Sequence, residues 1–229
     1  MVKESPARTV LRIGHRGACG HAPENTLASI QKAIALGCDL TEVDAQRTAD
    51  GALVLLHDER VDRTTNGKGA LADMTLAAVR ALDAGGGQRI PTLEEALQAA
   101  RGRIGLILEL KAAGLAYDVC ALVRASGFPG GIIYASFLHD ELQHVRRADP
   151  DAHTLVLFKR LPRDPAAEAL RLQATHVGLR FDTATAPLIA SLRKARLTVF
   201  IYTVNKPADI ARMRELDVDG IVSDFPDRI

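Results

Sequence analysis

The stretch GIIYASFLHDELQHVRRADPDAHTLVLF, residues 131–158, contains the repeating unit that decides the fold. An apolar, β-branched run begins near Gly131 and predicts a strand, and the following segment with His139 and His144 predicts a helix. A second apolar run begins near His153, 22 residues after the first. That interval is what a strand, a loop, a helix and a second loop require. The stretch therefore predicts one β/α unit of a parallel sheet.

The same unit recurs along almost the whole chain. Most intervals between predicted strand starts are 22 to 30 residues long. Eight such units predict an α/β protein with a (β/α)8 TIM barrel, whose usual size is about 250 residues. An open, doubly wound sheet is the alternative, but eight strands at this spacing favour a closed barrel. The predicted strands begin near Val10, Leu40, Ile104, Gly131, His153, Thr175, Thr198 and Gly220.

Two departures from a regular barrel are expected within a single domain of residues 1–229. Only five residues follow Asp224, so the last helix should be missing or rudimentary. The interval between Leu40 and Ile104 is 64 residues and predicts a small insertion after the second strand, at about residues 47–90. Glycines within that segment indicate loops and short elements.

The insertion begins with a hairpin signal, Asp50-Gly51, between two segments that carry apolar residues. A two-residue turn flanked by Ala49 and Ala52 would place His57 opposite Asp44, within a residue or two. Helix starts are signalled elsewhere by the capping box Thr92-Leu93-Glu94-Glu95 and by the cap and first-turn proline Asp164-Pro165.

Composition narrows the class of protein. The 29 Lys+Arg and 28 Asp+Glu residues leave a net charge of +1, and aromatic residues make up only 4%. Nucleic acid and anionic membranes are therefore not expected as partners. No run of 18 apolar residues predicts a membrane span, and the segment before Arg12 lacks the apolar region of a signal peptide. Three cysteines without metal-ligand spacing indicate reduced thiols in a cytoplasmic protein.

Acidic side chains gather at the predicted ends of two strands. Glu42 and Asp44 are two residues apart, so both point to the same face, and Glu109 and Lys111 have the same relation. Reactive groups of barrels lie at these strand ends. Three carboxylates without a nearby cysteine favour one divalent cation, Mg2+ or Ca2+, over zinc. The alternative is that the acids form structural salt bridges with Arg16 and Lys111.

Two of the seven histidines, His15 and His57, are expected beside this acidic cluster. Two imidazoles that flank a metal-bound group suit a reaction that removes one proton and donates another near neutral pH. For either histidine alone, packing in the core is the better interpretation. His139, His144, His153 and His176 are interpreted as structural or solvated. Arg16 and Lys111 would clamp an anion such as phosphate, or would balance the charge of the acids.

Short motifs extend from the first predicted strand to the last. They are His15-Arg16-Gly17, Pro23-Glu24-Asn25-Thr26, Glu42-x-Asp44, Asp50-Gly51, His57-Asp58, Arg63-Thr64-Thr65, Gly67, Gly69, Leu82-Asp83-Ala84-Gly85, Ile90-Pro91-Thr92-Leu93-Glu94-Glu95, Glu109-x-Lys111, Ser136-Phe137, Thr203-Val204-Asn205 and Asp219-Gly220-Ile221 with Asp224-x-Pro226. Together they closely resemble the bacterial, cytoplasmic type of the glycerophosphodiester phosphodiesterase family. The 42-residue spacing between His15 and His57, with an acidic pair between them, is more specific than any single triplet.

The resemblance implies a TIM barrel with an insertion after the second strand. It also implies metal-dependent hydrolysis of glycerophosphodiesters to glycerol 3-phosphate and an alcohol. Many relatives have Trp at the position of Tyr202, so the depth of the aromatic face differs here. The residue roles that it implies are general acid/base catalysis by His15 and His57, metal binding by Glu42, Asp44 and Glu109, phosphate binding by Arg16 and Lys111, orientation of the site by Asn25, and a substrate wall formed by Phe137 and Tyr202.

Other functions stay open at this point. A lysophospholipase D-like phosphodiesterase would need an exposed apolar lip, and the insertion has no long apolar run. A Schiff-base lyase would need a lowered pKa at Lys111, whereas Glu109 favours the charged form. A non-catalytic phosphoester-binding barrel would lack a catalytic histidine or a metal acid. We expect a small-molecule glycerophosphodiester as partner and no stable membrane association; the leaving alcohol and assembly as a homodimer are left open.

Overall fold

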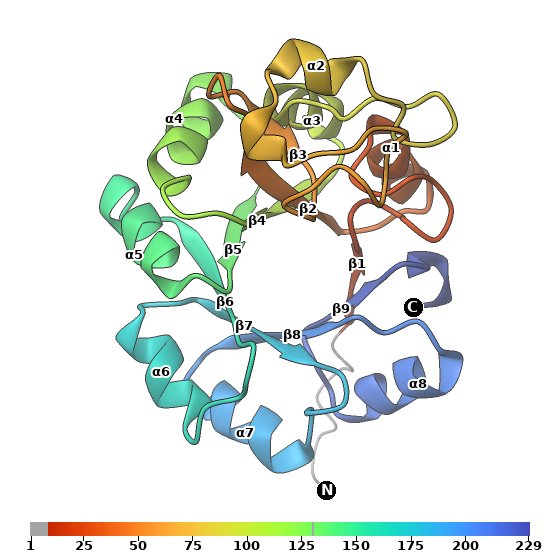
Figure 1. Cartoon of the computed structure of the whole chain (residues 1–229). Helices are drawn as coiled ribbons and strands as arrows, with labels where there is room; N and C mark the ends of the chain where they lie inside the picture. Colours follow the sequence, from red (N-terminus) through yellow and green to blue (C-terminus); the bar gives the residue numbers. More distant parts are fainter. Residues whose placement is uncertain (1–8, 130) are drawn as a thin grey trace, which may run out of the picture.

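Eight parallel strands form the wall of a closed barrel in the computed structural model, which describes residues 9–129 and 131–229 (Figure 1). The ring closes because β1 pairs with β2 on one side and with β9 on the other. This confirms the predicted TIM barrel, and every strand begins within one residue of its expected start. The strands are β1 (Leu11–Gly14), β2 (Leu40–Arg47), β4 (Gly105–Leu110), β5 (Ile132–Ser136), β6 (His153–Leu157), β7 (His176–Arg180), β8 (Thr198–Tyr202) and β9 (Gly220–Ser223).

Helices connect successive strands on the outside of this ring (Figure 1). The predicted capping box at Thr92 and the cap at Asp164 are both present. After β9, the described residues contain only the 3-10 turn η2 (Pro226–Arg228), as expected for a rudimentary last helix. None of the described helices is long and apolar enough to cross a bilayer. The outer helices are α1 (Leu27–Ala35), α3 (Leu93–Ala100), α4 (Ala116–Ser126), α5 (His139–Ala148), α6 (Pro165–Arg171), α7 (Ala186–Lys194) and α8 (Pro207–Glu215). The expectation about a signal peptide concerns residues 1–8, which lie outside the described ranges.

The expected insertion lies between β2 and α3. It contains β3 (Leu53–Leu55), η1 (Leu71–Asp73) and α2 (Leu76–Arg80). β3 is antiparallel to β2, so it extends that strand as a hairpin outside the ring. A small apolar cluster of its own holds the insertion together, made of Val54, Leu56, Val61, Leu71, Val79, Ala84 and Ile90.

The hairpin register differs by one residue from the expectation. Thr48 pairs with Ala52, so the loop has three residues, and Gly51 occupies its last position with a φ of 86°. The prediction of a two-residue turn flanked by Ala49 and Ala52 is therefore wrong. A left-handed glycine in the third loop position is typical of three-residue hairpins. As a result Leu56, rather than His57, donates its backbone N–H to the Asp44 carbonyl.

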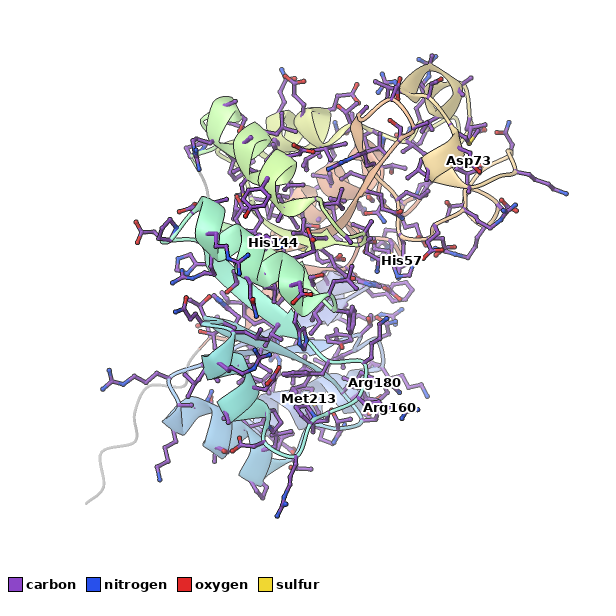
Figure 2. The ribbon with its side chains drawn as sticks, turned by 60° about the vertical axis from the view of Figure 1, so that its left-hand side comes forward. His57, Asp73, His144, Arg160, Arg180 and Met213 are labelled. Atoms are coloured by element: carbon purple, nitrogen blue, oxygen red, sulfur yellow. The ribbon has the colours of Figure 1, made fainter. Side chains whose placement is uncertain are left out.

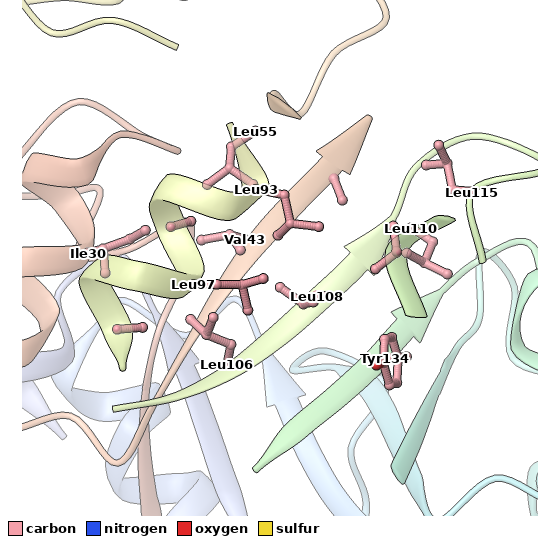
Figure 3. Packing of buried hydrophobic residues seen from close by; sticks show 14 of the residues in the cluster. Ile30, Val43, Leu55, Leu93, Leu97, Leu106, Leu108, Leu110, Leu115 and Tyr134 are labelled. Atoms are coloured by element: carbon pink, nitrogen blue, oxygen red, sulfur yellow. The ribbon is translucent and has the colours of Figure 1, made fainter. Parts of the chain in front are cut away.

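Strand residues alternate between two apolar layers. Residues such as Ile107 and Phe200 fill the barrel interior, whereas Leu106 and Leu108 pack outward against α3 (Figure 3). Since successive side chains point to opposite faces, Glu109 faces the interior, as Ile107 does. The same alternation turns Val43 outward into the helix layer (Figure 3) and Glu42 and Asp44 inward. The acids thus lie at the carboxyl end of the barrel.

The base of the barrel holds a buried imidazole with a testable effect on stability. The His176 ring lies 5.1 Å from the Phe200 ring and 5.9 Å from the His153 ring. Burial and the His153 ring lower the pKa of His176 to about 4, although Asp219 opposes the shift. A histidine in the unfolded chain titrates near 6.5, so the unfolded state binds more protons between about pH 6.5 and pH 4. Stability contributed by the neutral ring is therefore lost as the pH falls through this window.

We expect the wild-type protein to lose about 3 kcal/mol of unfolding free energy through His176 over that window. His176→Gln should lose correspondingly less between the two pH values, as measured by urea unfolding. His144→Gln removes a half-buried imidazole from α5 and serves as the control. Parallel pH curves for wild type and His176→Gln would contradict this prediction.

Candidate active site

Three carboxylates form a cluster at the carboxyl end of β2 and β4. In the ladder between these strands, Asp44 is the direct partner of Glu109. One oxygen each of Glu42, Asp44 and Glu109 lies within 4.8 Å of the others. Asp44 is 1% exposed and Glu42 is 7% exposed, so water neutralises little of this charge. Burial and the neighbouring acids raise the pKa of Glu42 well above its usual range, and that of Glu109 is also raised.

Two cations compensate the cluster in part. Lys111 Nζ lies 2.7 Å from Glu109 Oε1 and 3.5 Å from Asp44 Oδ1. Arg16 Nε lies 3.5 Å from Asp44 Oδ2, and the Arg16 backbone N–H donates to Glu42 Oε2 at 2.9 Å. Burial opposes both charges, but the surrounding acids raise the pKa of Arg16 and of Lys111. When all three acids are ionised, the two cations leave one negative charge uncompensated.

The donor set fits a hard divalent cation. Glu42 Oε1 and Asp44 Oδ1 are buried and accept no hydrogen bond from any described residue. An unsatisfied buried oxygen is costly unless a cation or water completes its environment. Carboxylate oxygens are the ligands that Mg2+ and Ca2+ prefer. Glu42, Asp44 and Glu109 are thus the residues here that could hold such an ion.

Asn25 orients one of these acids. Its Nδ2 donates to Asp44 Oδ2 at 2.8 Å, and its Oδ1 accepts the Asp44 backbone N–H at 3.0 Å. The backbone of Asn25 is left-handed, with a φ of 55°, and its side chain is buried. Asparagine tolerates this conformation better than most residues. The two-point contact fixes the position of the Asp44 carboxylate.

His15 is held by a carboxylate from the C-terminal part of the chain, next to it in the barrel. Its Nδ1 lies 2.6 Å from Asp224 Oδ1, and Asn205 Nδ2 donates to Asp224 Oδ2 at 2.6 Å. Cys19 Sγ donates to Asp224 Oδ1 at 3.0 Å. Burial opposes ionisation of Asp224, but the hydrogen bonds from His15 and Cys19 lower its pKa well below the usual range. An ionised Asp224 holds a proton on Nδ1 and leaves Nε2 of His15 free for chemistry.

His57, in the insertion that follows β2, has the same arrangement. Its Nδ1 lies 2.6 Å from Asp58 Oδ1, and Arg63 Nε donates to Asp58 Oδ2 at 2.6 Å. The Arg63 hydrogen bond lowers the pKa of Asp58 well below its usual range. Burial lowers the pKa of His57 itself, although Asp44 and Asp58 oppose the shift. His57 is therefore neutral near pH 7 and able to accept a proton.

Glu24 connects the two sides of the site. Its Oε1 accepts from Arg16 Nη1 at 2.8 Å and from Arg63 Nη2 at 2.7 Å. The β1 loop and the insertion are thus linked through one carboxylate. Sequence reasoning gave no role to Asp224, Asp58, Arg63 or Glu24, although all four belong to motifs quoted above. Their position within those motifs was the available signal.

A pocket of about 430 Å³ opens beside the carboxylates on the barrel axis. His15, Glu42 and Glu109 line one side, and Phe137 and Tyr202 line another, with ring centroids 6.2 Å apart in an edge-to-face arrangement. His57 and Lys111 line a separate, more open pocket with Asp58 and Arg63. The two imidazoles thus approach the acidic cluster from different sides. His139, His144, His153 and His176 lie on α5 or at strand starts, as expected.

The loop after β1 depends on one glycine. Gly17 has a φ of 85°, and a Cβ there would lie 2.5 Å from the Ser29 carbonyl carbon. Gly17→Ala should therefore combine backbone strain with overpacking and cost at least ~2 kcal/mol of unfolding free energy. Gly51→Ala is the matched control, because Gly51 has a φ of 86° but no atom within 4 Å of the added Cβ. Equal losses in urea unfolding would show that the contact with Ser29 is unimportant.

A TIM barrel with a buried acidic cluster between two histidine–aspartate pairs defines a hydrolase that acts on phosphate esters. The profile of the Glycerophosphoryl diester phosphodiesterase family matches residues 15–228, and the chain belongs to this family. It is accordingly an enzyme of the glycerophosphodiester phosphodiesterase class.

Similar proteins cover nearly the whole chain. YhdW of Bacillus subtilis strain 168 is 38% identical over 95% of both chains. The crystal structure of the glycerophosphodiester phosphodiesterase from Agrobacterium tumefaciens C58 is similar with a TM-score of 0.86 and 32% identity, covering 96% of this chain and 98% of that one. A phosphodiesterase from Oleispira antarctica, solved in complex with its product sn-glycerol-3-phosphate, has a TM-score of 0.89 and 27% identity, with 95% and 94% of the chains covered.

Proposed function

We propose that this enzyme hydrolyses glycerophosphodiesters to glycerol 3-phosphate and an alcohol, as one catalytic domain with one divalent cation. The observation that carries the proposal is the buried cluster of Glu42, Asp44 and Glu109, which has unsatisfied oxygens and an oriented imidazole on either side. The product complex of the Oleispira antarctica relative supports the same product. When bound, Mg2+ or Ca2+ would polarise a phosphoryl oxygen and offset charge that develops on it.

Arg16 and Lys111 bind the substrate phosphate in this proposal. Both cations already face the acidic cluster, and Arg16 Nε makes no hydrogen bond within the described part of the chain. A guanidinium can donate two parallel hydrogen bonds to non-bridging oxygens, whereas an ammonium acts as a point charge. Phe137 and Tyr202 provide an aromatic wall for the carbon skeleton of the substrate.

The two histidines divide the proton transfers. One accepts a proton from the attacking hydroxyl, and the other donates a proton to the departing alcohol oxygen. The attacking group is water, or the 2-hydroxyl of the substrate glycerol followed by opening of a cyclic phosphate. We favour the cyclic route because two imidazoles can exchange acid and base roles across its two steps. His57 suits the base role first, since its pKa is lowered.

The remaining alternatives make different demands on the site. A Schiff-base lyase needs a desolvated lysine of lowered pKa, whereas Asp44 and Glu109 raise the pKa of Lys111 despite its burial. A lysophospholipase D-like activity needs an apolar surface for an acyl chain beside the pocket. The substrate we propose is a small molecule in the cytoplasm; the free thiols of Cys19, Cys38 and Cys120 support that compartment.

The test is hydrolysis of a substrate panel with Mg2+ or Ca2+ present. Glycerophosphodiesters of choline, ethanolamine, glycerol and inositol should each be offered, with release of glycerol 3-phosphate as the readout. We expect release from at least one of them. Faster cleavage of a lysophospholipid than of all four would favour the lysophospholipase D-like alternative. Binding without any cleavage would indicate a phosphoester-binding barrel.

A further inference from the structure

A second pocket adjoins the active site at the carboxyl ends of β6 and β7. It encloses about 440 Å³ and is lined by Lys159, Arg160, Arg180 and Asp182, among others. Gly178 lines both this pocket and the active-site pocket, so the two adjoin on β7. Figure 2 shows Arg160 and Arg180 beside one another on the side of the molecule that carries His57. The second pocket is therefore a neighbour of the pocket in which the substrate would bind.

The charge of the second pocket is positive. Arg180 forms a two-point ion pair with Asp182, at 3.1 and 2.6 Å, so these two charges largely cancel. Lys159 and Arg160 are exposed and form no ion pair with any carboxylate among residues 9–129 and 131–229. Both follow β6 directly in the loop that leads to α6. Two uncompensated cations thus face one side of the pocket in a chain whose net charge is only +1.

Arg180 connects this positive pocket with the aromatic wall of the active site. It is the direct strand partner of Tyr202, which lines the active-site pocket. Burial raises the pKa of Tyr202, and the charge of Arg180 opposes that rise. The acidic metal cluster lies on β2 and β4, across the barrel mouth from β6 and β7. A ligand that touches both regions would place one anionic group against Arg16 and Lys111 and a second against Lys159 and Arg160.

We propose that the pocket of Lys159 and Arg160 binds a second phosphate of the substrate, carried by the alcohol beyond the phosphate that is cleaved. The inference rests on the proposed function and specifies its substrate class: glycerophosphodiesters whose alcohol carries a further phosphate. Flexible, exposed cations suit such a group because they can approach phosphate oxygens without a fixed geometry. A neutral or cationic alcohol such as ethanolamine would gain nothing from this pocket.

The experiment compares three substrates that differ only in this second group. Glycerophosphoglycerol has one phosphate, its extension by a further glycerol phosphate unit has a second phosphodiester, and its terminally phosphorylated form has a phosphomonoester. At low ionic strength, wild type should show roughly tenfold higher kcat/KM for the two substrates with a second phosphate. The expected gain is modest because exposed ion pairs are individually weak. The ratio of the two kcat/KM values, with and without the second phosphate, should fall toward one in 0.5 M salt, where the Debye length is about 4 Å.

The double variant Lys159→Gln/Arg160→Gln should lose most of this preference. Its kcat/KM for glycerophosphoglycerol should stay within about twofold of wild type, since neither residue faces the reacting atoms. Arg147→Gln/Lys194→Gln removes the same charge from the last turns of α5 and α7, at the opposite end of the barrel, and should keep the preference. Comparing kcat/KM for the two substrates with a second phosphate tells whether the pocket favours a phosphodiester or a phosphomonoester.

Two outcomes would overturn the inference while leaving the proposed function intact. Wild type could cleave all three substrates with equal kcat/KM, or the Lys159→Gln/Arg160→Gln variant could keep the wild-type preference. If wild type cleaves none of the three but releases glycerol 3-phosphate from the choline, ethanolamine or inositol diester, this inference fails and the proposed function stands. Release from no glycerophosphodiester at all would overturn the proposed function, and this inference with it.

Discussion

Replacing His15 or His57 with Ala should lower kcat at least ~10²-fold, the usual contribution of a positioned general acid or base. Each imidazole has its Nδ1 held by an aspartate at 2.6 Å, so a single nitrogen is left for proton transfer. No other described histidine lines the active-site pocket or the adjoining pocket of His57. Glycerol 3-phosphate release under saturating Mg2+ or Ca2+ measures the effect. Near-normal turnover in either variant would contradict the assignment.

Two further variants distinguish proton transfer from a general loss of structure. His144→Gln changes an imidazole on α5 that faces away from the pockets and should retain wild-type kcat. Asp224→Asn keeps a hydrogen-bond acceptor for His15 but removes the charge that holds the Nδ1 proton. We expect it to shift the pH dependence of kcat as well as its value, which a purely structural role would not do.

Chelation of divalent cations should abolish activity, and added Mg2+ or Ca2+ should restore it. The physical reason is the concentrated negative charge of Glu42, Asp44 and Glu109, together with two buried oxygens, Glu42 Oε1 and Asp44 Oδ1, that accept no hydrogen bond from any described residue. The same ion should stabilise the fold: at roughly one hundred times its Kd, binding adds about 2.7 kcal/mol to the unfolding free energy. Thermal unfolding with and without the cation therefore provides a readout independent of turnover.

Glu109→Gln should reduce both effects, because it removes one anionic oxygen donor while keeping the shape of the side chain. Glu94→Gln, on the exposed face of α3, is the control and should leave the cation response unchanged. Full activity in a protein stripped of metal would show that the acidic cluster serves only to balance Arg16 and Lys111.

Much of the barrel could be predicted because its signals are local. The spacing between apolar runs located the start of each barrel strand to within one residue. The capping box at Thr92 located α3. The hairpin register could not be fixed in the same way. Asp50-Gly51 is compatible with loops of two or three residues, and only the left-handed position of Gly51 in the fold decides between them.

The site was predictable in part for a related reason. Glu42 and Asp44 share a strand, so their common face followed from alternation alone. The partners of the histidines depend on closure of the ring instead. Asp224 is 209 residues from His15 along the chain and meets it only because β9 pairs with β1. The charge of the pocket beside Arg160 likewise depends on which side chains lack a counter-ion, which spacing does not reveal.

The contact between His15 and Asp224 links the ends of β1 and β9, the two strands whose pairing closes the barrel. Within residues 9–129 and 131–229, only the short η2 turn follows β9, whereas a full helix follows each of the other barrel strands before the next one begins. An opening between β1 and β9 would separate the Asp224 carboxylate from the His15 imidazole. Catalytic activity therefore depends on the pairing of β1 with β9. On warming, we expect turnover to be lost at a lower temperature than the helical circular dichroism signal.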